Sequence, residues 1–391
     1  MPVLFLIVFV DLVGFGIVIP LLPFYAEHFG AGPEVVTMVM ASYSLAQLFT
    51  APLWGRLSDR IGRRPVLLAS LAGSVLAYLA LAAAPSLLVL FLARIAAGAM
   101  AGNIAAAQAY IADVTPPERR AQGMGMIGAA FGLGFILGPA IGGVLAGHDP
   151  ANVDFVLPAL TAAGLSALAL VGTILVLRES LDRSQPPRPR VARLAAARRV
   201  LGRPGIAPYI LIGFATVSVF AGMETTFALW SSRTFGWGPA QNGYLFAFVG
   251  ILGAVLQGLA IGRLTRRFGE LRLLAAGLFL LAVGLFGLGM AGSVAMLFAT
   301  SALLGIGFGL ANPSLASLVS RSADPADQGM VLGVYQSASS LSRVVGPLLA
   351  GVAFAHLGKS APFLVGAAVL LPVAVIVVRM AVRPAAAEPR R

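Results

Sequence analysis

The sequence contains no cysteine, and charged residues make up only 11% of its 391 positions. The absence of cysteine excludes disulfide bonds and thiolate metal sites. A soluble domain carries about 25% charged residues, so the scarcity of charge argues against an ordinary soluble fold. Hydrophobic residues reach 59%, with a mean hydropathy of +0.92. Most of the chain is therefore expected to lie in lipid.

Apolar runs long enough to cross a bilayer as helices recur from one end of the chain to the other. The alternating strands that mark a membrane β-barrel are not seen. The sequence thus predicts an all-α membrane protein with twelve transmembrane helices. The expected spans are 3–25, 35–55, 65–84, 86–111, 121–146, 155–177, 208–232, 240–262, 271–291, 294–319, 327–353 and 360–381.

Basic residues are divided unequally between the two sides of this topology. With the N-terminus inside, 23 of the 27 Lys and Arg residues fall in cytoplasmic segments, and only Arg233 and Lys359 in outer loops. Because cytoplasmic loops are enriched in basic residues, we expect a multi-pass protein of the cell (inner) membrane with both termini cytoplasmic. The same bias accounts for the net charge of +12, so nucleic acid is not an expected partner.

The two halves of the chain resemble each other. "GRLSDRIGRRPVLLAS" at 55–70 returns as "GRLTRRFGELRLLAAG" at 262–277, and "LGPAIGG" at 137–143 returns as "VGPLLAG" at 345–351. We therefore expect two pseudo-symmetric six-helix bundles in the same orientation, as in transporters that hold substrate at the membrane midplane. The expected parts are the N-terminal bundle 1–177, a cytoplasmic Arg- and Pro-rich linker 178–207, and the C-terminal bundle 208–391 with a short cytoplasmic tail.

Four stretches carry a family pattern. They are the loop from Gly55 to Arg64, "DLVGFGIVIPLLPFY" in the first span, "RIAAGAMAG" in the fourth and "FGLGFILGPAIGG" in the fifth. Together they resemble the motifs of the major facilitator superfamily and of its twelve-span drug:proton antiporters, including the tetracycline and multidrug resistance antiporters. The resemblance implies the major facilitator fold, a monomer without a cofactor, and proton-coupled export of lipophilic small molecules or drugs by alternating access.

The resemblance also gives the loop a mechanical role, that of a conformational latch. Asp59 would face the N-terminus of span 11, where a helix dipole favours negative charge, and Arg63 would reach Asp113. The charges could instead serve only the cytoplasmic bias, although an acid adds nothing to that bias. The latch residues are Gly55, Asp59, Arg60, Gly62, Arg63, Arg64 and Asp113.

The glycines of the fifth span form a smooth face for close helix packing, and Pro139 permits a bend. In antiporters of the family this motif is associated with export, and tight packing alone is the other interpretation. The motif residues are Gly134, Gly138, Pro139, Gly142 and Gly143.

Four ionisable residues stand inside the predicted spans: Asp11, Arg94, Glu224 and Arg343. Such residues are costly in lipid and usually face a cavity or a partner. Helix rise places Asp11 and Arg94 near the midplane, and Glu224 and Arg343 at matching depth in the outer half. The depths suggest one acid–base pair in each half. Each pair either takes part in proton coupling or holds helices together as a static bridge.

The cavity walls are expected to be apolar with a few polar and aromatic groups, which suit a lipophilic ligand. Any of these residues could instead serve helix packing. The substrate-binding candidates are Phe15, Tyr43, Gln47, Asn103, Gln108, Phe131, Phe220, Phe227, Trp230, Asn312 and Gln336.

One departure weakens tetracycline as the substrate. Tetracycline antiporters carry an acid in span 9, and here "LRLLAAGLFLLAVGLFGLGMA" has none. Two alternatives stay open: a major facilitator transporter of a small metabolite such as a sugar or organic acid, and a non-transporting membrane receptor or scaffold. An enzyme is not expected, because the sequence has no metal-ligand cluster, phosphate loop or nucleophile set.

Overall fold

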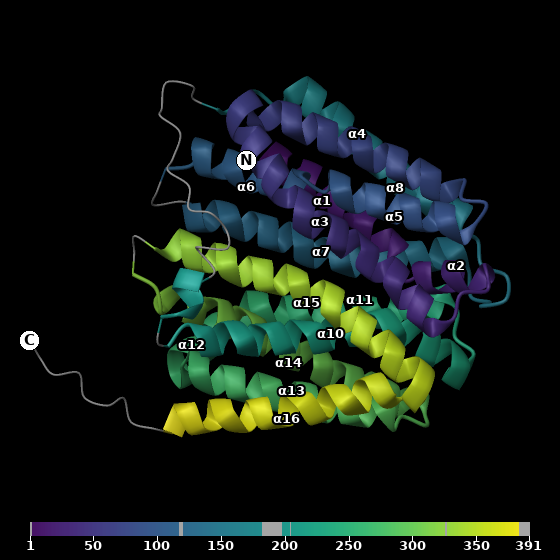
Figure 1. Cartoon of the computed structure of the whole chain (residues 1–391), viewed down its shortest axis with the longest axis vertical. Helices are drawn as coiled ribbons and strands as arrows, with labels where there is room; N and C mark the ends of the chain where they lie inside the picture. The colour runs from purple at the N-terminus through teal and green to yellow at the C-terminus, as the bar shows by residue number, and fades with distance from the viewer. Residues whose placement is uncertain (1, 117–119, 182–197, 204, 325–326, 383–391) are drawn as a thin grey trace, which may run out of the picture. The chain divides into compact units, whose positions relative to one another are not determined.

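The computed structural model describes residues 2–116, 120–181, 198–203, 205–324 and 327–382 (Figure 1). Within these ranges the regular structure is entirely helical. Eleven helices of the described part are long and apolar enough to cross a membrane, and a shorter apolar stretch, Gly132–Ala146, lies in a further one.

Each of the twelve expected spans falls on one helix or on a consecutive set of helices. The helices of the first half are α1 (Pro2–Val18), α2 (Leu22–His28), α3 (Pro33–Ile61), α4 (Arg63–Ala82), α5 (Leu87–Met100), α6 (Asn103–Val114), α7 (Arg120–Ala146) and α8 (Val156–Val176). The helices of the second half are α10 (Ala207–Phe235), α11 (Pro239–Val255), the π-helical turn η2 (Leu256–Ala260), α12 (Ile261–Phe268), α13 (Glu270–Gly289), α14 (Val294–Arg321), α15 (Gln328–Leu357) and α16 (Ala361–Val382).

The sequence-based boundaries fail at several places, among them the second and the fourth spans. The second span was expected to end at 55, but α3 continues to Ile61 and ends at Gly62, whose φ of 115° only glycine adopts readily. The fourth span, expected as one helix over 86–111, is divided into α5 and α6. The polar residues after position 55 therefore do not end α3. The apolar run over 86–111 likewise does not form one unbroken helix.

The chain forms two compact units. Unit 1 contains Met1–Pro189 and Thr225–Gly250, and unit 2 contains Arg190–Glu224 and Ile251–Arg391. The division passes through α10 and α11, so parts of two second-half helices belong with the first half. Of the predicted linker, residues 182–197 and 204 lie outside the described residues.

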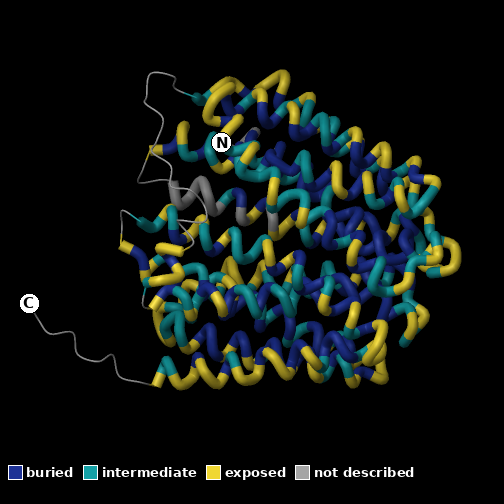
Figure 2. The backbone as a smooth tube through the Cα atoms, viewed as in Figure 1, coloured by how far each residue is buried: buried dark blue, intermediate teal, exposed yellow. Residues whose placement is uncertain are grey.

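The two faces of α16 show why these helices suit lipid. Its buried positions include Phe363, Ala367, Leu370, Ala374 and Val377, which recur at helical spacing. Figure 2 shows exposed positions along the other edge of the same helix. Those positions are apolar too: Val369, Leu371, Val375, Ile376 and Val378 are each more than 40% exposed. A helix that is apolar all round, with one face uncovered, is expected in a bilayer.

Corresponding helices pack in the same way in both halves. In unit 1, α4 packs against α8 and α5, and in unit 2, α13 packs against α16 and α14. Backbones also approach closely at equivalent glycines. Gly138 of α7 lies against Gly16 of α1, and Gly346 of α15 lies against Ser218 of α10. The sequence repeat is therefore a repeat of packing, with small residues where backbones meet.

Candidate functional site

Asp11 lies on α1 inside unit 1, and its side chain is only 6% exposed. The hydroxyl of Ser166 on α8 donates a hydrogen bond to Asp11 Oδ1 over 2.9 Å. The side-chain amide of Asn103, the first residue of α6, donates to Asp11 Oδ2. Two neutral donors from two other helices thus hold the buried carboxylate.

Arg94 lies on α5 and is only 4% exposed. Its guanidinium carbon stands 4.6 Å from the ring centre of Tyr43 on α3, a cation–π contact. Its Nε atom is buried and has no hydrogen-bond partner in the described part of the chain. The ring of Phe15 lies 5.0 Å from that of Tyr43, centre to centre. The structure therefore links three of the predicted residues: Tyr43 contacts the buried cation of Arg94, and Phe15 packs against Tyr43.

The expected ion pair between Asp11 and Arg94 is absent among the described residues, so this prediction was wrong. Asp11 is held by Ser166 and Asn103, and Arg94 by Tyr43. Tyr78 on α4, which the sequence did not single out, interacts electrostatically with both Asp11 and Arg94. Matching depth in the membrane did not reveal the direction in which each side chain leaves its helix.

In unit 2, Glu224 on α10 is half-buried and Arg343 on α15 is exposed. The charge of Arg343 acts electrostatically on Glu224, and the pairing expected from their matching depth stays a prediction. Phe220, one turn before Glu224, stacks on Phe308 of α14 with ring centres 4.0 Å apart. The structure therefore places one aromatic candidate, Phe220, and the acid of the expected pair, Glu224, one turn apart on α10.

The remaining substrate-binding candidates divide by exposure. Phe227 and Trp230 are almost completely buried, at 2% and 1%, and pack with other rings of unit 1. Gln47 is half-buried, whereas Gln108, Asn312 and Gln336 are exposed. The side chain of Phe131 lies outside the described residues. Phe227 and Trp230 are thus core residues, which fits the packing interpretation.

The loop between α3 and α4 is organised by Arg63. Its Nε lies 2.8 Å from Asp113 Oδ2 at the end of α6, the contact that the family pattern implies. Its Nη1 pairs with Asp59 and donates to Ser58 Oγ over 3.1 Å. One buried guanidinium therefore ties α3, α4 and α6 together through charge-assisted bonds.

Glu179, just beyond α8, is a member of this cluster that the sequence did not indicate. Its carboxylate accepts hydrogen bonds from the backbone N–H groups of Arg63 and Arg64, at 2.8 and 3.1 Å. A Cβ atom at Gly62 would lie 2.6 Å from the Glu179 carboxyl carbon. Partial desolvation raises the pKa of the largely exposed Glu179, but four backbone N–H donors outweigh it and leave the pKa below its ordinary value.

The glycine motif of α7 faces two helices of unit 1. Gly134, Gly138 and Gly142 lie against the backbone of α1 at Leu12, Gly16 and Ile17. Gly143 meets the backbone at Pro239 of α11, and the carbonyl of Pro139 meets Gly243. The same motif thus brings three helices into backbone contact.

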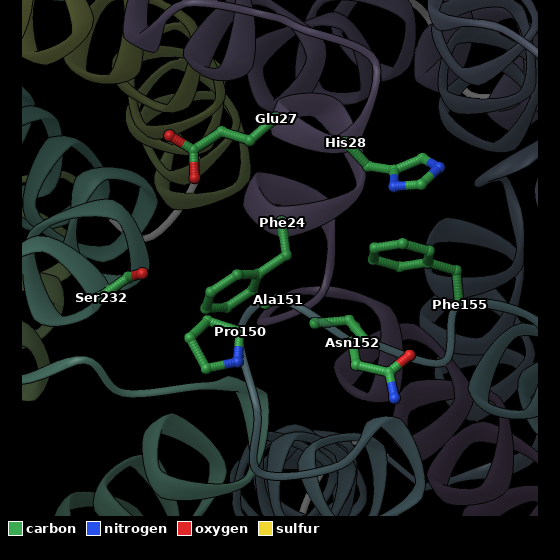
Figure 3. A pocket seen from close by; sticks show the side chains of 9 residues that line it. Phe24, Glu27, His28, Pro150, Ala151, Asn152, Phe155 and Ser232 are labelled. Atoms are coloured by element: carbon green, nitrogen blue, oxygen red, sulfur yellow. The ribbon is translucent and has the colours of Figure 1, made fainter.

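A pocket of about 290 Å³ lies near the C-terminal end of α2, within unit 1. Figure 3 shows the ring of Phe24 at its centre and that of Phe155 beside the His28 imidazole. Glu27 also lines it, but its carboxylate is paired with Arg233 over 3.0 Å. The pocket therefore offers aromatic and neutral polar surface more than a free charge.

Known proteins match the chain over most of its length. The model of the Major Facilitator Superfamily matches residues 4–269 and 255–391. The class C tetracycline resistance protein of Escherichia coli is 34% identical over 92% of each chain. Multidrug resistance protein 2 of Bacillus subtilis (strain 168) is 29% identical over 93% of this chain and 90% of its own.

Solved structures agree with this match. The human organic anion transporter MFSD10 (TETRAN) is 26% identical, covers 96% of this chain and 98% of its own, and has a TM-score of 0.72. The nucleoside transporter NupG (D323A mutant) is 14% identical with a TM-score of 0.80 over 97% and 98%, a likeness of fold alone. The chain is a multi-pass membrane protein with the all-α fold expected from its sequence, and it belongs to the major facilitator superfamily of transporters.

Proposed function

We propose that this chain exports lipophilic small molecules in exchange for protons, by alternating access. The observation that carries the proposal is the setting of Asp11. A buried carboxylate held by two neutral donors, with no ion pair to a cation in the described part of unit 1, can bind and release a proton. Ionisable residues in this position are expensive for a membrane protein and mark ion and proton pathways.

The aromatic groups near the charged residues of both units suit a lipophilic substrate. The ring of Tyr43 contacts Arg94 and packs against Phe15, and Phe220, one turn before Glu224, stacks on Phe308. Ligand sites of this kind are mostly apolar with a few fixed polar groups. Glu224 is the second candidate for the coupling acid, and its interaction with Arg343 makes it the candidate for a static pair.

Organic anions are a second candidate substrate class, and Arg94 favours them. Its buried Nε lacks a hydrogen-bond partner among the described residues, and an anionic substrate would satisfy it. The similar human protein is named an organic anion transporter. Tetracycline is a weaker candidate although several relatives are tetracycline resistance proteins, because no acid stands within α13 beyond its first residue, Glu270.

Around this site we propose the roles that the family resemblance implies. The Arg63 cluster with Asp59 and Asp113 would act as the conformational latch, and the α7 glycines as the packing motif of an exporter. The protein would act as a monomer in the inner membrane with both termini cytoplasmic. The exposed apolar residues of α16 and the distribution of arginines support this placement.

The test uses purified protein in liposomes with an imposed pH gradient and an internal pH dye. Lipophilic cations, tetracyclines, organic anions and sugars are added in turn to the wild type, Asp11→Asn and Glu224→Gln. Asp324→Asn is the matched control, because Asp324 is an exposed acid beyond the end of α14. Proton movement that follows one compound class and is lost in Asp11→Asn but kept in the control supports the proposal. Substrate uptake without proton movement in any variant contradicts proton coupling.

A further inference from the structure

The break between α5 and α6 is built around one hydroxyl group. Ser70 on α4 is completely buried. Its Oγ accepts hydrogen bonds from the backbone N–H groups of Gly102 and Asn103, at 3.0 and 2.9 Å, and donates one to the carbonyl of Met100. These backbone groups lie where α5 ends and α6 begins, so one side chain serves backbone groups left without helical partners.

Side chains of α3 complete the break. Trp54 Nε1 donates to the carbonyl of Ala99 over 2.6 Å, and Gly102 leaves no room for a side chain beside the Trp54 indole. The segment at the break, "GAMAGN" at 98–103, contains no proline. The usual cause of a sharp helix interruption is therefore missing, and contacts from α3 and α4 hold the chain in this shape.

The break between α5 and α6 determines which groups contact Asp11. Asn103 is the first residue of α6, and its side-chain amide donates to the Asp11 carboxylate while its Oδ1 accepts from the N–H of Ile104. The N-terminus of a helix carries partial positive charge, which favours a negative group beside it. An unbroken helix would have no terminus beside Asp11. The break therefore supplies the partial positive charge that the absent ion pair with Arg94 does not provide.

Few other titratable groups face Asp11. Tyr78 on α4 interacts with it electrostatically, and Arg94 on α5 acts on Tyr78. The neighbouring α8 contributes the hydroxyl of Ser166 and contains no titratable residue, and α7 contains none after Arg120. A change in the pH at which Asp11 releases its proton can thus be attributed to a small set of neighbouring groups.

We propose that Ser70 is a positioning residue for proton exchange at Asp11. By fixing the break, it keeps Asn103 and the N-terminus of α6 on the carboxylate and so sets the pH at which Asp11 releases its proton. This rests on the proposed role of Asp11 in transport. Ser70 itself does not touch the carboxylate; it acts through the backbone of residues 102 and 103.

The test follows the carboxyl band of Asp11 by infrared difference spectroscopy during a pH titration, with Asp11→Asn as the spectral blank. In Ser70→Ala the stabilisation of the charged carboxylate is lost, so the midpoint is expected to move to higher pH by about 0.5–1 unit. Ser74→Ala is the matched control, since Ser74 is buried one turn further along α4 and makes no hydrogen bond to the break. Its midpoint should equal that of the wild type.

A folded Ser70→Ala protein with the wild-type midpoint would overturn the proposal and leave Ser70 a purely structural residue. If Ser70→Ala does not fold, Asn103→Ala keeps the hydroxyl and removes the amide, and its midpoint should also rise; an unchanged midpoint there overturns the proposal equally. Proton-coupled transport that persists in Asp11→Asn refutes the proposed coupling role instead. The infrared titration does not depend on transport, so the two failures are distinguishable.

Discussion

Glu27 at the end of α2 and Arg233 near the end of α10 form an ion pair, with Arg233 Nη2 3.0 Å from Glu27 Oε1. The same region of unit 1 contains a backbone hydrogen bond from Ala240 to the carbonyl of Gly147 over 3.1 Å. The predicted topology places these helix ends outside the membrane. First-half and second-half segments thus meet there through an ion pair, a backbone bond and the glycine contacts of α7.

Breaking this ion pair is expected to favour opening of the outer side. In Glu27→Gln the shift should be small, because both side chains are partly exposed and such pairs contribute about 0.2–1 kcal/mol. The chain has no native cysteine, so Ser232→Cys can report opening through labelling by a membrane-impermeant maleimide. Labelling should accelerate by less than about tenfold in the glutamine variant.

The exchange of the two charges, Glu27→Arg with Arg233→Glu, serves as the control and should return labelling to the starting rate. Lys359→Cys, at an exposed position, should label equally in every background. Equal labelling of Ser232→Cys with and without the pair would mean that the pair does not restrain opening.

The contact between Gly138 and Gly16 gives a sharper prediction. A Cβ atom at Gly138 would stand 2.6 Å from Gly16 Cα, and backbone cannot move aside cheaply. We expect Gly138→Ala to destabilise the protein by about 1–3 kcal/mol, the usual cost of overpacking. Thermal unfolding in detergent measures this effect.

Gly132 offers the matched control on the same helix, because nothing lies within 4 Å of a Cβ atom there. Gly132→Ala should leave the unfolding temperature unchanged or raise it slightly, since alanine favours helix more than glycine. If both variants unfold alike, close packing of α1 and α7 is not what the motif requires.

Arg63 should contribute far more than its neighbour Arg60 to the free energy of unfolding. Arg63 is buried among Ser58, Asp59 and Asp113, and its truncation to alanine removes its ion pairs with both carboxylates. We expect Arg63→Ala to cost about 1.5–3 kcal/mol, the range for hydrogen bonds to charged groups. Arg60→Ala, on the exposed side of the same helix end, should stay within about 0.5 kcal/mol. Chemical unfolding compares the two, and equal losses would refute a special role for Arg63.

The Arg63 cluster also shows what a sequence can and cannot predict. The contact between Arg63 and Asp113 was expected only because the loop resembles the signature motif of the family. The contact of Glu179 with the same loop depends on the path that the chain takes after α8, which no local pattern records. Likewise the helix spans follow from hydropathy, while the break at 101–102 depends on Ser70 and Trp54, distant residues with ordinary appearance.

Asp11 and Arg94 illustrate the same limit at the site. Counting residues predicts their depth in the membrane, because helix rise is constant. The partners of each residue depend on how its helix is rotated about its axis and packed, which residue counting does not predict. In the structure, Asn103 and Ser166 contact Asp11, and Tyr43 contacts Arg94.

Glu179 gives the chain a pH-dependent contribution to stability. Its pKa in the folded protein lies below the ordinary value of 4.5, so the contribution is fully present above that value and is lost as the pH falls through the lower folded pKa. Because Glu179 is exposed to water, the contribution should stay below about 1 kcal/mol. The difference in unfolding temperature between the wild type and Glu179→Gln should be constant above about pH 5.5 and vanish in stronger acid. A difference that persists at low pH would contradict this sign.

Glu224 and Arg343 allow proton coupling to be separated from a static bridge. Glu224→Gln and Arg343→Gln each leave one charge in the protein without its partner, so each should destabilise unit 2. The double variant removes both charges and should recover most of that stability in thermal unfolding. If Glu224 carries protons, transport by the double variant stays uncoupled from the pH gradient although the fold is restored. If the pair is only a bridge, coupling returns with stability, and Asp11 is left as the acid that exchanges protons. Liposome transport and unfolding temperature, measured on the same four proteins, decide between these outcomes.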